Sequence, residues 1–310
     1  MVRVKEVFPP QSLKVSQKVA RKLKRKLEHR TEDLVRTLTQ RHIWSEVVNQ
    51  QEIRIVGLKR TGNHAIINWL EPQGKGKIKH INNLQVNVNP YRYKYERLRD
   101  YYPEHQWSMQ DYEKEARGNL VAKDLLLYSY EDYELKKVFS DYFESKHDLY
   151  LGKSAIRYDL LILRDPFNLF ASRVKKNYLD VQNHQQNMVD LWIEYAEEFL
   201  GKTSYLKHNK VCLNYNQWVE DVDYRKEISA QLNLEFSDAG IDKVSGCGDG
   251  SSFEGRSLNG KAAKMDVNNR WQHFLEDESY RDLMNNEQLV GYSEQIFGHI
   301  PGTEKLRTGK

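Results

Sequence analysis

Cysteine is nearly absent from this chain, which contains only Cys212 and Cys247 among 310 residues. Two distant thiols without a second pair provide neither the ligand spacing of a zinc site nor a disulfide framework, and they favour a reducing compartment. No apolar run is long enough to span a membrane, and the N-terminus lacks the apolar segment of a secretory signal. We therefore expect no bound metal, no transmembrane helix and a cytoplasmic location.

An excess of one charge is also missing, because 48 Lys and Arg residues oppose 44 Asp and Glu residues, for a formal charge of +4. This balance predicts no nucleic-acid binding. The basic residues concentrate at the N-terminus, where residues 1–50 read as a basic amphipathic helical extension. Two roles fit this extension: a solvated helix packed at the domain edge, which we favour, or a helix that contacts a membrane surface or an acidic partner. Its apolar residues at roughly helical spacing are Leu13, Val15, Val19, Leu23 and Leu27.

The rest of the sequence alternates β-rich runs with helical patterns, which predicts an α/β fold with a parallel sheet. We expect one domain over residues 51–300 and a tail over 301–310. Residues 82–118 show no clear periodicity. The expected strands are 52–57, 77–81, 120–122, 125–128, 158–163 and 210–215. The expected helices are 65–70, 132–142, a helix from about 168, 187–200 and 218–232.

A basic loop follows the first expected strand and leads into a helix. It consists of Lys59, Arg60, Thr61, Gly62, Asn63 and His64. Backbone N–H groups and the helix dipole favour an anion at such a position. Gly62 allows the backbone to approach a ligand, and the two basic side chains add full positive charge. The loop lacks the Lys-Ser/Thr pair of G-x-x-x-x-G-K-[ST], which disfavours a magnesium-dependent ATPase. Taken alone, it could also be an ordinary basic turn.

A second anion-binding candidate lies at the end of the expected strand 158–163. Arg164 follows the strand, Asp165 and Pro166 can begin the next helix, and Ser172 comes eight residues after the arginine. Open α/β sheets bind ligands at the carboxyl ends of their strands. The guanidinium fork and one hydroxyl can therefore surround a compact anion. The alternative is a structural Arg–Asp pair that closes a turn.

Together these segments resemble the sulfotransferases that depend on 3'-phosphoadenosine-5'-phosphosulfate (PAPS). Arg60-Thr61-Gly62 matches the family's 5'-phosphosulfate loop, and the interval from Arg164 to Ser172 matches its 3'-phosphate segment. The resemblance implies a P-loop-like three-layer α/β/α fold with a central parallel sheet. It also implies PAPS as the donor and adenosine 3',5'-bisphosphate as the product.

Three further stretches over residues 211–274 extend the resemblance. Tyr215, after Val-Cys-Leu-Asn, is similar to the family's adenine-contacting tyrosine. Ser252 and Phe253 are similar to its Ser–Phe element, in which the aromatic ring stacks on adenine. Arg270 opens Arg-Trp-Gln-His-Phe, which resembles the helix start after the second 3'-phosphate loop.

The chain also departs from the family. Ala65 and Ile66 stand where some cytosolic members have an aromatic residue, and the Arg-Lys-Gly loop is not reproduced. The charge of that loop would have to come from Lys261, Lys264 or Arg270. The pattern looks closer to bacterial carbohydrate-type sulfotransferases than to those acting on hormones or phenols.

The resemblance implies transfer of a sulfuryl group to an acceptor hydroxyl or amine through a loose in-line transition state. Arg60 is the best candidate to stabilise the charge on the departing oxygen, and Lys59 is the second choice. The acceptor also needs a general base. Our candidates are Glu131 first, His80 second and His64 third.

Other functions remain open on the sequence. A P-loop-type kinase, a non-catalytic nucleotide-binding relative and a membrane- or acid-binding scaffold are the alternatives. We expect an acceptor with a free hydroxyl, in a saccharide or glycoconjugate. The aromatic-rich stretch 91–112 could stack on sugar rings or form a packed peripheral layer. The sequence does not indicate an oligomeric state.

Overall fold

The computed structural model describes residues 11–39, 46–102, 104, 106–178, 181, 187–246 and 250–307. The chain separates into two compact units, Met1–Glu46 and Val47–Lys310. In the first unit, Gln11–Thr39 form a single helix, α1. Leu23 and Leu27 are exposed, whereas the side chains of Leu13, Val15 and Val19 lie outside the described residues. No described helix combines the length and the hydropathy that a membrane crossing requires.

The second unit is built on a parallel sheet of five strands, in the order β2-β3-β1-β4-β5. The sheet confirms the predicted α/β class. Because all the strands run in one direction, their carboxyl ends lie along the same edge. The strand bounds are β1 Val47–Gly57, β2 Ile78–Ile81, β3 Lys123–Glu131, β4 Lys153–Leu163 and β5 Lys210–Asn214. The first strand therefore begins before the domain boundary predicted at residue 51.

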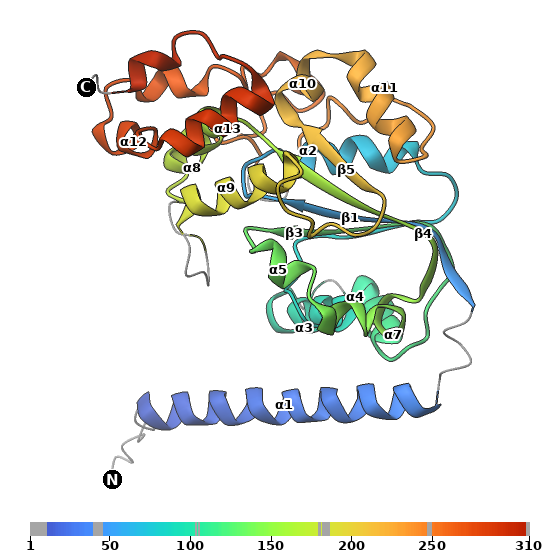
Figure 1. Cartoon of the computed structure of the whole chain (residues 1–310). Coiled ribbons are helices and arrows are strands. Elements are labelled where there is room, and N and C mark those ends of the chain that lie inside the picture. The colour runs from blue at the N-terminus through green and yellow to red at the C-terminus, as the bar shows by residue number, and fades with distance from the viewer. Residues whose placement is uncertain are drawn as a thin grey trace, which may run out of the picture. The chain divides into compact units, whose positions relative to one another are not determined.

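Helices cover both faces of this sheet. On one face α2 (Asn63–Leu70), α10 (Tyr215–Glu220) and α11 (Val222–Gln231) pack over alternate apolar strand residues. The other face carries α3 (Pro90–Tyr101), α4 (Gln106–Ala116), α5 (Leu135–Val138) and α7 (His147–Leu151), as Figure 1 shows. Burial on both faces explains why strands such as β4 end in continuous apolar runs.

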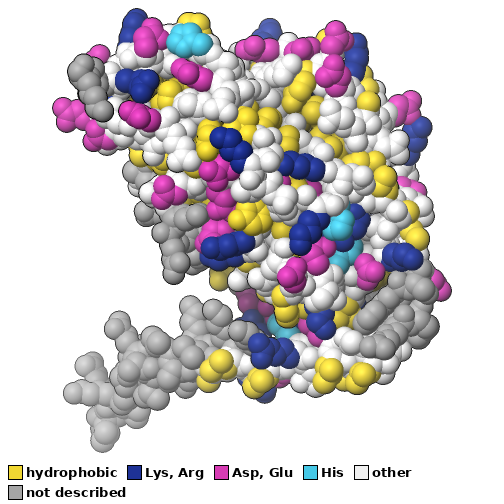
Figure 2. Space-filling model, viewed as in Figure 1, with side chains coloured by type: hydrophobic (Ala, Val, Ile, Leu, Met, Phe, Trp, Pro, Cys, Tyr) yellow, Lys and Arg dark blue, Asp and Glu magenta, His cyan; other side chains and the backbone are white. Residues whose placement is uncertain are grey.

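The remaining helices form a layer that includes the C-terminal region. The contacts between them join α8 to the 3-10 turn Arg270–Phe274, α9 to α13, and α12 to α8. A final turn, Thr303–Leu306, is anchored by the buried side chain of Leu306. On the face of the molecule shown in Figure 2, basic and acidic side chains are interspersed. The bounds in this layer are α8 Pro166–Lys175, α9 Met188–Phe199, α12 Glu278–Leu283 and α13 Glu287–Phe297, while the short α6 (Asp141–Glu144) lies between α5 and α7 in the sequence.

Two helices, α3 and α4, occupy the stretch for which the sequence showed no periodicity. The Asn89 side chain accepts hydrogen bonds from the backbone N–H groups of Tyr91 at 3.0 Å and Arg92 at 3.1 Å. Pro90 takes the first helical position, where its missing N–H costs nothing. Tyr91 is fully buried and packs on Tyr112, with their ring centroids 6.3 Å apart. At these two tyrosines the stretch forms a packed layer.

Two single helices expected from the sequence are each broken in the structure. Asp132 adopts a left-handed φ of 60°, so the chain turns before the short helices α5 and α6 begin. Asp221 is extended between α10 and α11, and its side chain caps α11 by accepting from the N–H groups of Asp223 and Tyr224. A helix cannot continue through either backbone conformation. The predictions of one helix over 132–142 and one over 218–232 are therefore wrong.

Candidate functional site

The loop between β1 and α2 folds back on itself. The Thr61 N–H donates to the Leu58 carbonyl at 3.1 Å, and both Arg60 (φ 73°) and Gly62 (φ 105°) are left-handed. A Cβ atom on Gly62 would lie 2.0 Å from Cε2 of Tyr215, so only glycine fits here. The tyrosine of α10 therefore presses directly against the backbone of the loop.

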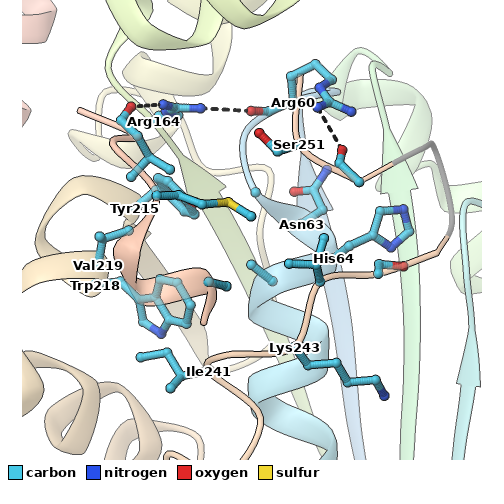
Figure 3. Close-up of a pocket in the computed structure, with 18 of the residues that line it drawn as sticks. Arg60, Asn63, His64, Arg164, Tyr215, Trp218, Val219, Ile241, Lys243 and Ser251 are labelled. Atoms are coloured by element: carbon cyan, nitrogen blue, oxygen red, sulfur yellow. Dashed lines mark hydrogen bonds between the residues drawn. The ribbon is translucent and has the colours of Figure 1, made fainter. Parts of the chain in front are cut away.

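Arg60 and Arg164, from the two predicted motifs, lie side by side in one pocket (Figure 3). Nη1 of Arg164 donates to the Arg60 carbonyl at 3.4 Å, while Nη2 of Arg60 donates to the Gly250 carbonyl at 2.9 Å. Arg164 is only 1% exposed, because it follows directly after β4, beside β1 in the sheet. The neighbouring strands thus bring two guanidinium groups to one place.

A third arginine joins this cluster from the C-terminal region. The Ser172 hydroxyl lies 3.4 Å from Nη1 of Arg164 and 3.2 Å from Nη1 of Arg270. Nη2 of Arg270 also donates to the Ser251 hydroxyl at 2.8 Å and to Glu254 at 3.0 Å. The guanidinium groups of Arg164 and Arg270 therefore share one serine hydroxyl, and Arg60 joins the cluster through its backbone carbonyl.

Burial and the repulsion between like charges lower the pKa values of two arginines in the cluster. Burial and then the charge of Arg270 lower the pKa of Arg164 to about 10. Burial and Arg270 also lower the pKa of Arg60. Like charges that are held together and desolvated gain stability when an anion enters between them. The cluster is therefore a candidate site for a multiply charged anion.

Asp165 does not pair with the arginine beside it. Its carboxylate caps α8 by accepting from the N–H of Asn168 at 2.8 Å, and it accepts from Nδ2 of Asn216 at 2.9 Å. Arg164 instead donates to the carbonyl of Val267. The alternative of an Arg–Asp pair closing a turn is not what the structure shows.

The pocket around the arginines, which we call the loop pocket, combines cations with an apolar wall. It encloses about 940 Å³, including its open mouth. Tyr215 stacks on Trp218 with ring centroids 5.7 Å apart, and Ile241 and Met265 add apolar surface. In the view of Figure 3, Arg60 and Arg164 lie at the upper end of this pocket, and Trp218 lies at the lower end. Such a pocket can hold a flat ring and the charged groups attached to it.

Several predicted residues lie around the loop pocket without lining it. The Ser252 hydroxyl donates to the Ser172 carbonyl at 2.9 Å. The Phe253 ring lies 5.0 Å from the Arg270 guanidinium and supports it by a cation–π contact. Thr61, a residue of the loop, has a fully buried side chain. Lys59 is drawn away by Asp132, which accepts from its backbone N–H at 2.8 Å and lies 3.8 Å from its Nζ.

A second pocket, which we call the α3 pocket, meets the loop pocket at three shared residues. Arg60, His64 and Glu131 line both. The α3 pocket encloses about 1320 Å³, including open space. Its other lining residues are Lys59, Asn82, Asn83, Lys94, Arg97, Leu98, Tyr102 and Tyr178. A group held in one pocket can therefore meet a molecule in the other at these three side chains.

The candidate bases differ in position. Glu131 accepts from Nδ2 of Asn63 at 2.9 Å, and burial raises the pKa of its carboxyl group. Burial, His80 and Arg60 lower the pKa of His64 to about 4, which leaves the imidazole neutral at pH 7. His80 lies 3.3 Å from Glu71 and lines neither pocket. By position, Glu131 and His64 are better placed than His80.

Sequence reasoning missed the residues that complete both pockets. Trp218 stands one helical turn after Tyr215, and this spacing could have indicated that they share a face. Lys243, Lys94 and Arg97 carried no signal, because only the folded chain brings them to the pockets. Among the described residues, no group of three or more His, Cys, Asp or Glu side chains is arranged to hold a metal ion.

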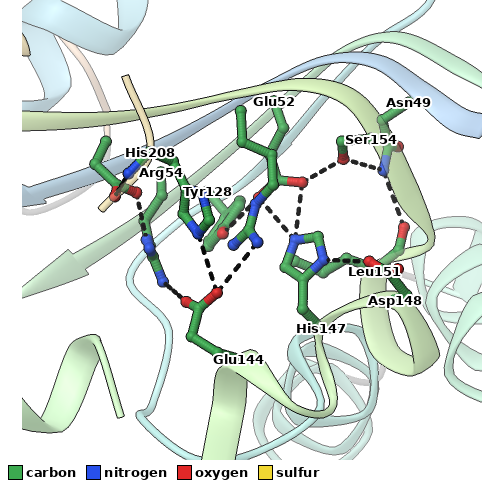
Figure 4. A network of polar contacts seen from close by, with 12 residues as sticks. Asn49, Glu52, Arg54, Tyr128, Glu144, His147, Asp148, Leu151, Ser154 and His208 are labelled. Atoms are coloured by element: carbon green, nitrogen blue, oxygen red, sulfur yellow. Dashed lines mark hydrogen bonds and ion pairs between the residues drawn. The ribbon is translucent and has the colours of Figure 1, made fainter. Parts of the chain in front are cut away.

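A separate buried polar network lies on the sheet face opposite α2 (Figure 4). Glu52 of β1 is 1% exposed and accepts from Tyr128 at 2.7 Å, His147 at 2.8 Å, Arg157 at 3.3 Å and Ser154. Burial alone would raise the pKa of Glu52, but His147 and Arg157 outweigh it and hold the pKa well below its ordinary value. Burial would lower the pKa of His147, but Glu52 outweighs it and raises that pKa. None of these residues lines either pocket.

Comparison with known proteins relates the chain to solved structures alone, since no family model and no curated protein matches it. The sulfotransferase domain from the Synechococcus PCC 7002 olefin synthase superposes with a TM-score of 0.52 at 12% identity, covering 83% of this chain and 98% of that one. Mouse sulfotransferase SULT7A1 complexed with PAP gives 0.44 at 11% identity, with coverage of 82% and 92%. Retinol dehydratase in complex with androsterone and inactive cofactor PAP gives 0.41 at 12% identity, with coverage of 84% and 85%. The first likeness shows that this chain has the fold of that sulfotransferase domain.

Proposed function

We propose that this protein is a sulfotransferase that uses PAPS as its donor. One observation carries the proposal: Arg60 and Arg164, which follow adjacent parallel strands, line one pocket and are joined by a hydrogen bond. PAPS is a single molecule with a phosphosulfate at one end and a 3'-phosphate at the other. Two arginine side chains that line one pocket beside an apolar wall suit such a ligand.

Each part of the donor has a matching feature in the loop pocket. The turn from Arg60 to the start of α2 would hold the 5'-phosphosulfate, since backbone N–H groups and a guanidinium meet there. Arg164 and Arg270, with the Ser172 hydroxyl that contacts both beside the pocket, would hold the 3'-phosphate, which would offset the positive charge of the two arginines. The stacked rings of Tyr215 and Trp218 would form the wall beside the adenine.

The proposed reaction occurs where the two pockets meet. An acceptor hydroxyl in the α3 pocket attacks sulfur, and the bond between sulfur and the bridging phosphate oxygen breaks. Glu131 takes the hydroxyl proton, and its raised pKa suits it to act as a base. Arg60 stabilises the negative charge that develops on the departing oxygen. The products are the sulfated acceptor and adenosine 3',5'-bisphosphate.

The same geometry argues against the alternative of a P-loop kinase. Such an enzyme places a magnesium-binding serine or threonine just after the loop. Here Asn63 stands at the start of α2, and its Nδ2 donates to Glu131 and to the Leu58 carbonyl at 3.0 Å. For the acceptor, we propose a hydroxyl of a saccharide, supported by the amide and tyrosine side chains that line the α3 pocket.

The test combines nucleotide binding with turnover. We expect the purified protein to bind adenosine 3',5'-bisphosphate in a calorimetric titration and to transfer labelled sulfate from PAPS, but no phosphate from ATP. Glu131→Gln should lower kcat by roughly 10²–10⁴-fold while nucleotide affinity stays constant. The control is Glu235→Gln, because Glu235 is an exposed acid paired with Lys75.

The pH profile tests the assignment of the base. A base must be deprotonated, and burial raises the pKa of Glu131 above its ordinary value of 4.5. As the pH is lowered, the wild-type rate should therefore start to decrease at a pH higher than 4.5. Failure of the protein to retain adenosine 3',5'-bisphosphate would refute the proposed function. Full activity of Glu131→Gln together with loss of activity in His64→Gln would move the base to His64.

A further inference from the structure

The α3 pocket has a marked local imbalance of charge. Of the residues that line it in the described chain, Lys59, Arg60, Lys94 and Arg97 are basic, and Glu131 is the one acid. The whole chain is nearly balanced, with a formal charge of +4, and mixed charges cover the face shown in Figure 2. Residues 1–50 are basic as well, so the α3 pocket is a second, local concentration of positive charge in this chain.

Two of the four cations also interact with groups outside the α3 pocket. Lys59 is held by Asp132, and Arg60 also lines the loop pocket and donates to Gly250. Lys94 and Arg97 lie on α3 and line only the α3 pocket. Neither of them belongs to the site proposed for the donor.

Lys94 and Arg97 are arranged to act together. Residues three apart on a helix lie on the same face, so both side chains project from one side of α3. Nη1 of Arg97 donates to the Tyr93 hydroxyl at 3.4 Å, which orients the guanidinium group. Lys94 also lies close enough to the reaction centre to help lower the pKa of His64. Lys94 thus extends a positive field from α3 to the point where the pockets meet, and Arg97 adds a second cation on the same pocket wall.

We propose that the acceptor carries an oxyanion in addition to the hydroxyl that receives the sulfuryl group, and that Lys94 and Arg97 bind this oxyanion. The inference rests on the proposed function and names its substrate class. A carboxylate of a sugar acid, a sulfate ester or a phosphate ester supplies the same chemistry: a compact anion that accepts charge-assisted hydrogen bonds from both cations.

The remaining lining residues suit such a substrate. Asn82 and Asn83 offer amide donors and acceptors for hydroxyl groups. Tyr102 and Tyr178 are both partly exposed and provide aromatic surface at the pocket. A polar ring that bears one charged substituent would therefore find partners for each of its parts.

The first experiment compares matched probes on the protein saturated with adenosine 3',5'-bisphosphate, which keeps the loop pocket filled. Methyl glucoside is the neutral probe, and methyl glucuronide, glucose 6-sulfate and glucose 6-phosphate are the anionic ones. We expect at least one anionic probe to bind about tenfold more tightly than methyl glucoside, with an advantage that shrinks as salt is added. The tightest of the three identifies the kind of oxyanion.

The second experiment assigns the preference to residues. The double variant Lys94→Gln/Arg97→Gln should remove the advantage of the anionic probes and leave the affinity for methyl glucoside unchanged. Arg99→Gln is the matched control, because Arg99 lies on the same helix but is paired with Asp100 at 2.9 Å and does not line the pocket. This control should retain the full preference.

Three results would overturn the inference: equal binding of neutral and anionic probes, no measurable binding of any anionic probe, or a preference that survives in the double variant. A merely structural role for Lys94 and Arg97 would weaken all probes equally and would leave the salt dependence unchanged. Nucleotide affinity is measured separately in every variant. If the wild type does not bind the nucleotide, the proposed function itself is refuted. If nucleotide binding is retained but the acceptor probes do not behave as expected, only the inference about the acceptor is refuted.

Discussion

Replacing Arg164 with alanine should weaken the binding of adenosine 3',5'-bisphosphate far more than that of adenosine 5'-monophosphate. The two nucleotides differ only in the 3'-phosphate, which we place at Arg164, Ser172 and Arg270. The comparison therefore isolates the contact between one guanidinium group and one phosphate, in the manner of a double-mutant cycle.

The expected magnitude follows from the surroundings of Arg164. The side chain is 1% exposed, so its hydrogen bonds to the phosphate would be shielded from water. Each hydrogen bond to a charged group contributes roughly 1.5–3 kcal/mol, and a guanidinium group can offer two to a phosphate. The existing bond to the Val267 carbonyl must be given up, at about 1 kcal/mol. The net loss is about 3 kcal/mol, or more than 100-fold in Kd.

Isothermal titration of both nucleotides against wild type and Arg164→Ala provides the measurement. We expect adenosine 5'-monophosphate to lose no more than about threefold in affinity, which is less than 1 kcal/mol. Arg157→Ala is the control for general damage, because Arg157 of β4 is largely buried in the polar network, pairs with Glu144 at 3.1 Å and lines neither pocket. Equal losses for both nucleotides in Arg164→Ala, or no loss for either, would show that Arg164 does not bind the 3'-phosphate.

Two further substitutions test the loop and the polar network. Gly62→Ala should lower the free energy of unfolding by about 2–4 kcal/mol, because Gly62 has a φ of 105° and its new Cβ would lie 2.0 Å from Tyr215. The control is Gly291→Ala in α13, which has open space around it and should not destabilise the protein. Both are measured by urea unfolding. Glu52→Gln should cost about 3 kcal/mol near pH 6, because it breaks the buried pair with His147. That loss should depend on pH, and unfolding curves at several pH values would show it.

The sign of the pH dependence follows from the two pKa shifts. The pKa of Glu52 lies below its ordinary value of 4.5, so its contribution is complete above 4.5 and is lost on further acidification. The pKa of His147 lies above its ordinary value of 6.5, so its contribution is complete below 6.5 and is lost as the pH rises through the raised value. A difference between wild type and Glu52→Gln that stayed constant at every pH would contradict this account. Equal stability of Gly62→Ala and Gly291→Ala would contradict the account of the loop.

The strand, loop and helix around Gly62 could be predicted because their signals are local. A β-rich run, a polar turn with glycine and a helical pattern follow one another within residues 52–70. The helices α3 and α4 were missed because their buried described residues lack a repeated aliphatic pattern, which gives weak periodicity. These residues are Pro90, Tyr91 and Arg92 in α3 and Glu115 and Ala116 in α4. The Asn89-Pro90 pair was the available signal, since asparagine caps helices and proline suits the first helical position.

Some residues of the candidate site could also be placed from the sequence, whereas others could not. That Arg60 and Arg164 would be neighbours could be inferred, because both follow strands of one parallel sheet. Glu131 is the terminal residue of β3 and pairs in register with Gly57 of β1, so its place beside the loop depends on strand order. The positions of Lys94 and Arg97 depend on how α3 packs, which no local pattern specifies. The roles predicted for individual residues remain predictions.

The alternation of strands and helices, the glycine turn and the chemical character of the two basic motifs all follow from local sequence. These features depend on backbone sterics and apolar periodicity within short segments. Three features depend on long-range packing: β1 lies between β3 and β4, a third arginine joins the first two, and a second, basic pocket opens beside Glu131. Contacts between residues far apart in sequence form only when the whole core is buried, so their partners are set by packing rather than by local preference.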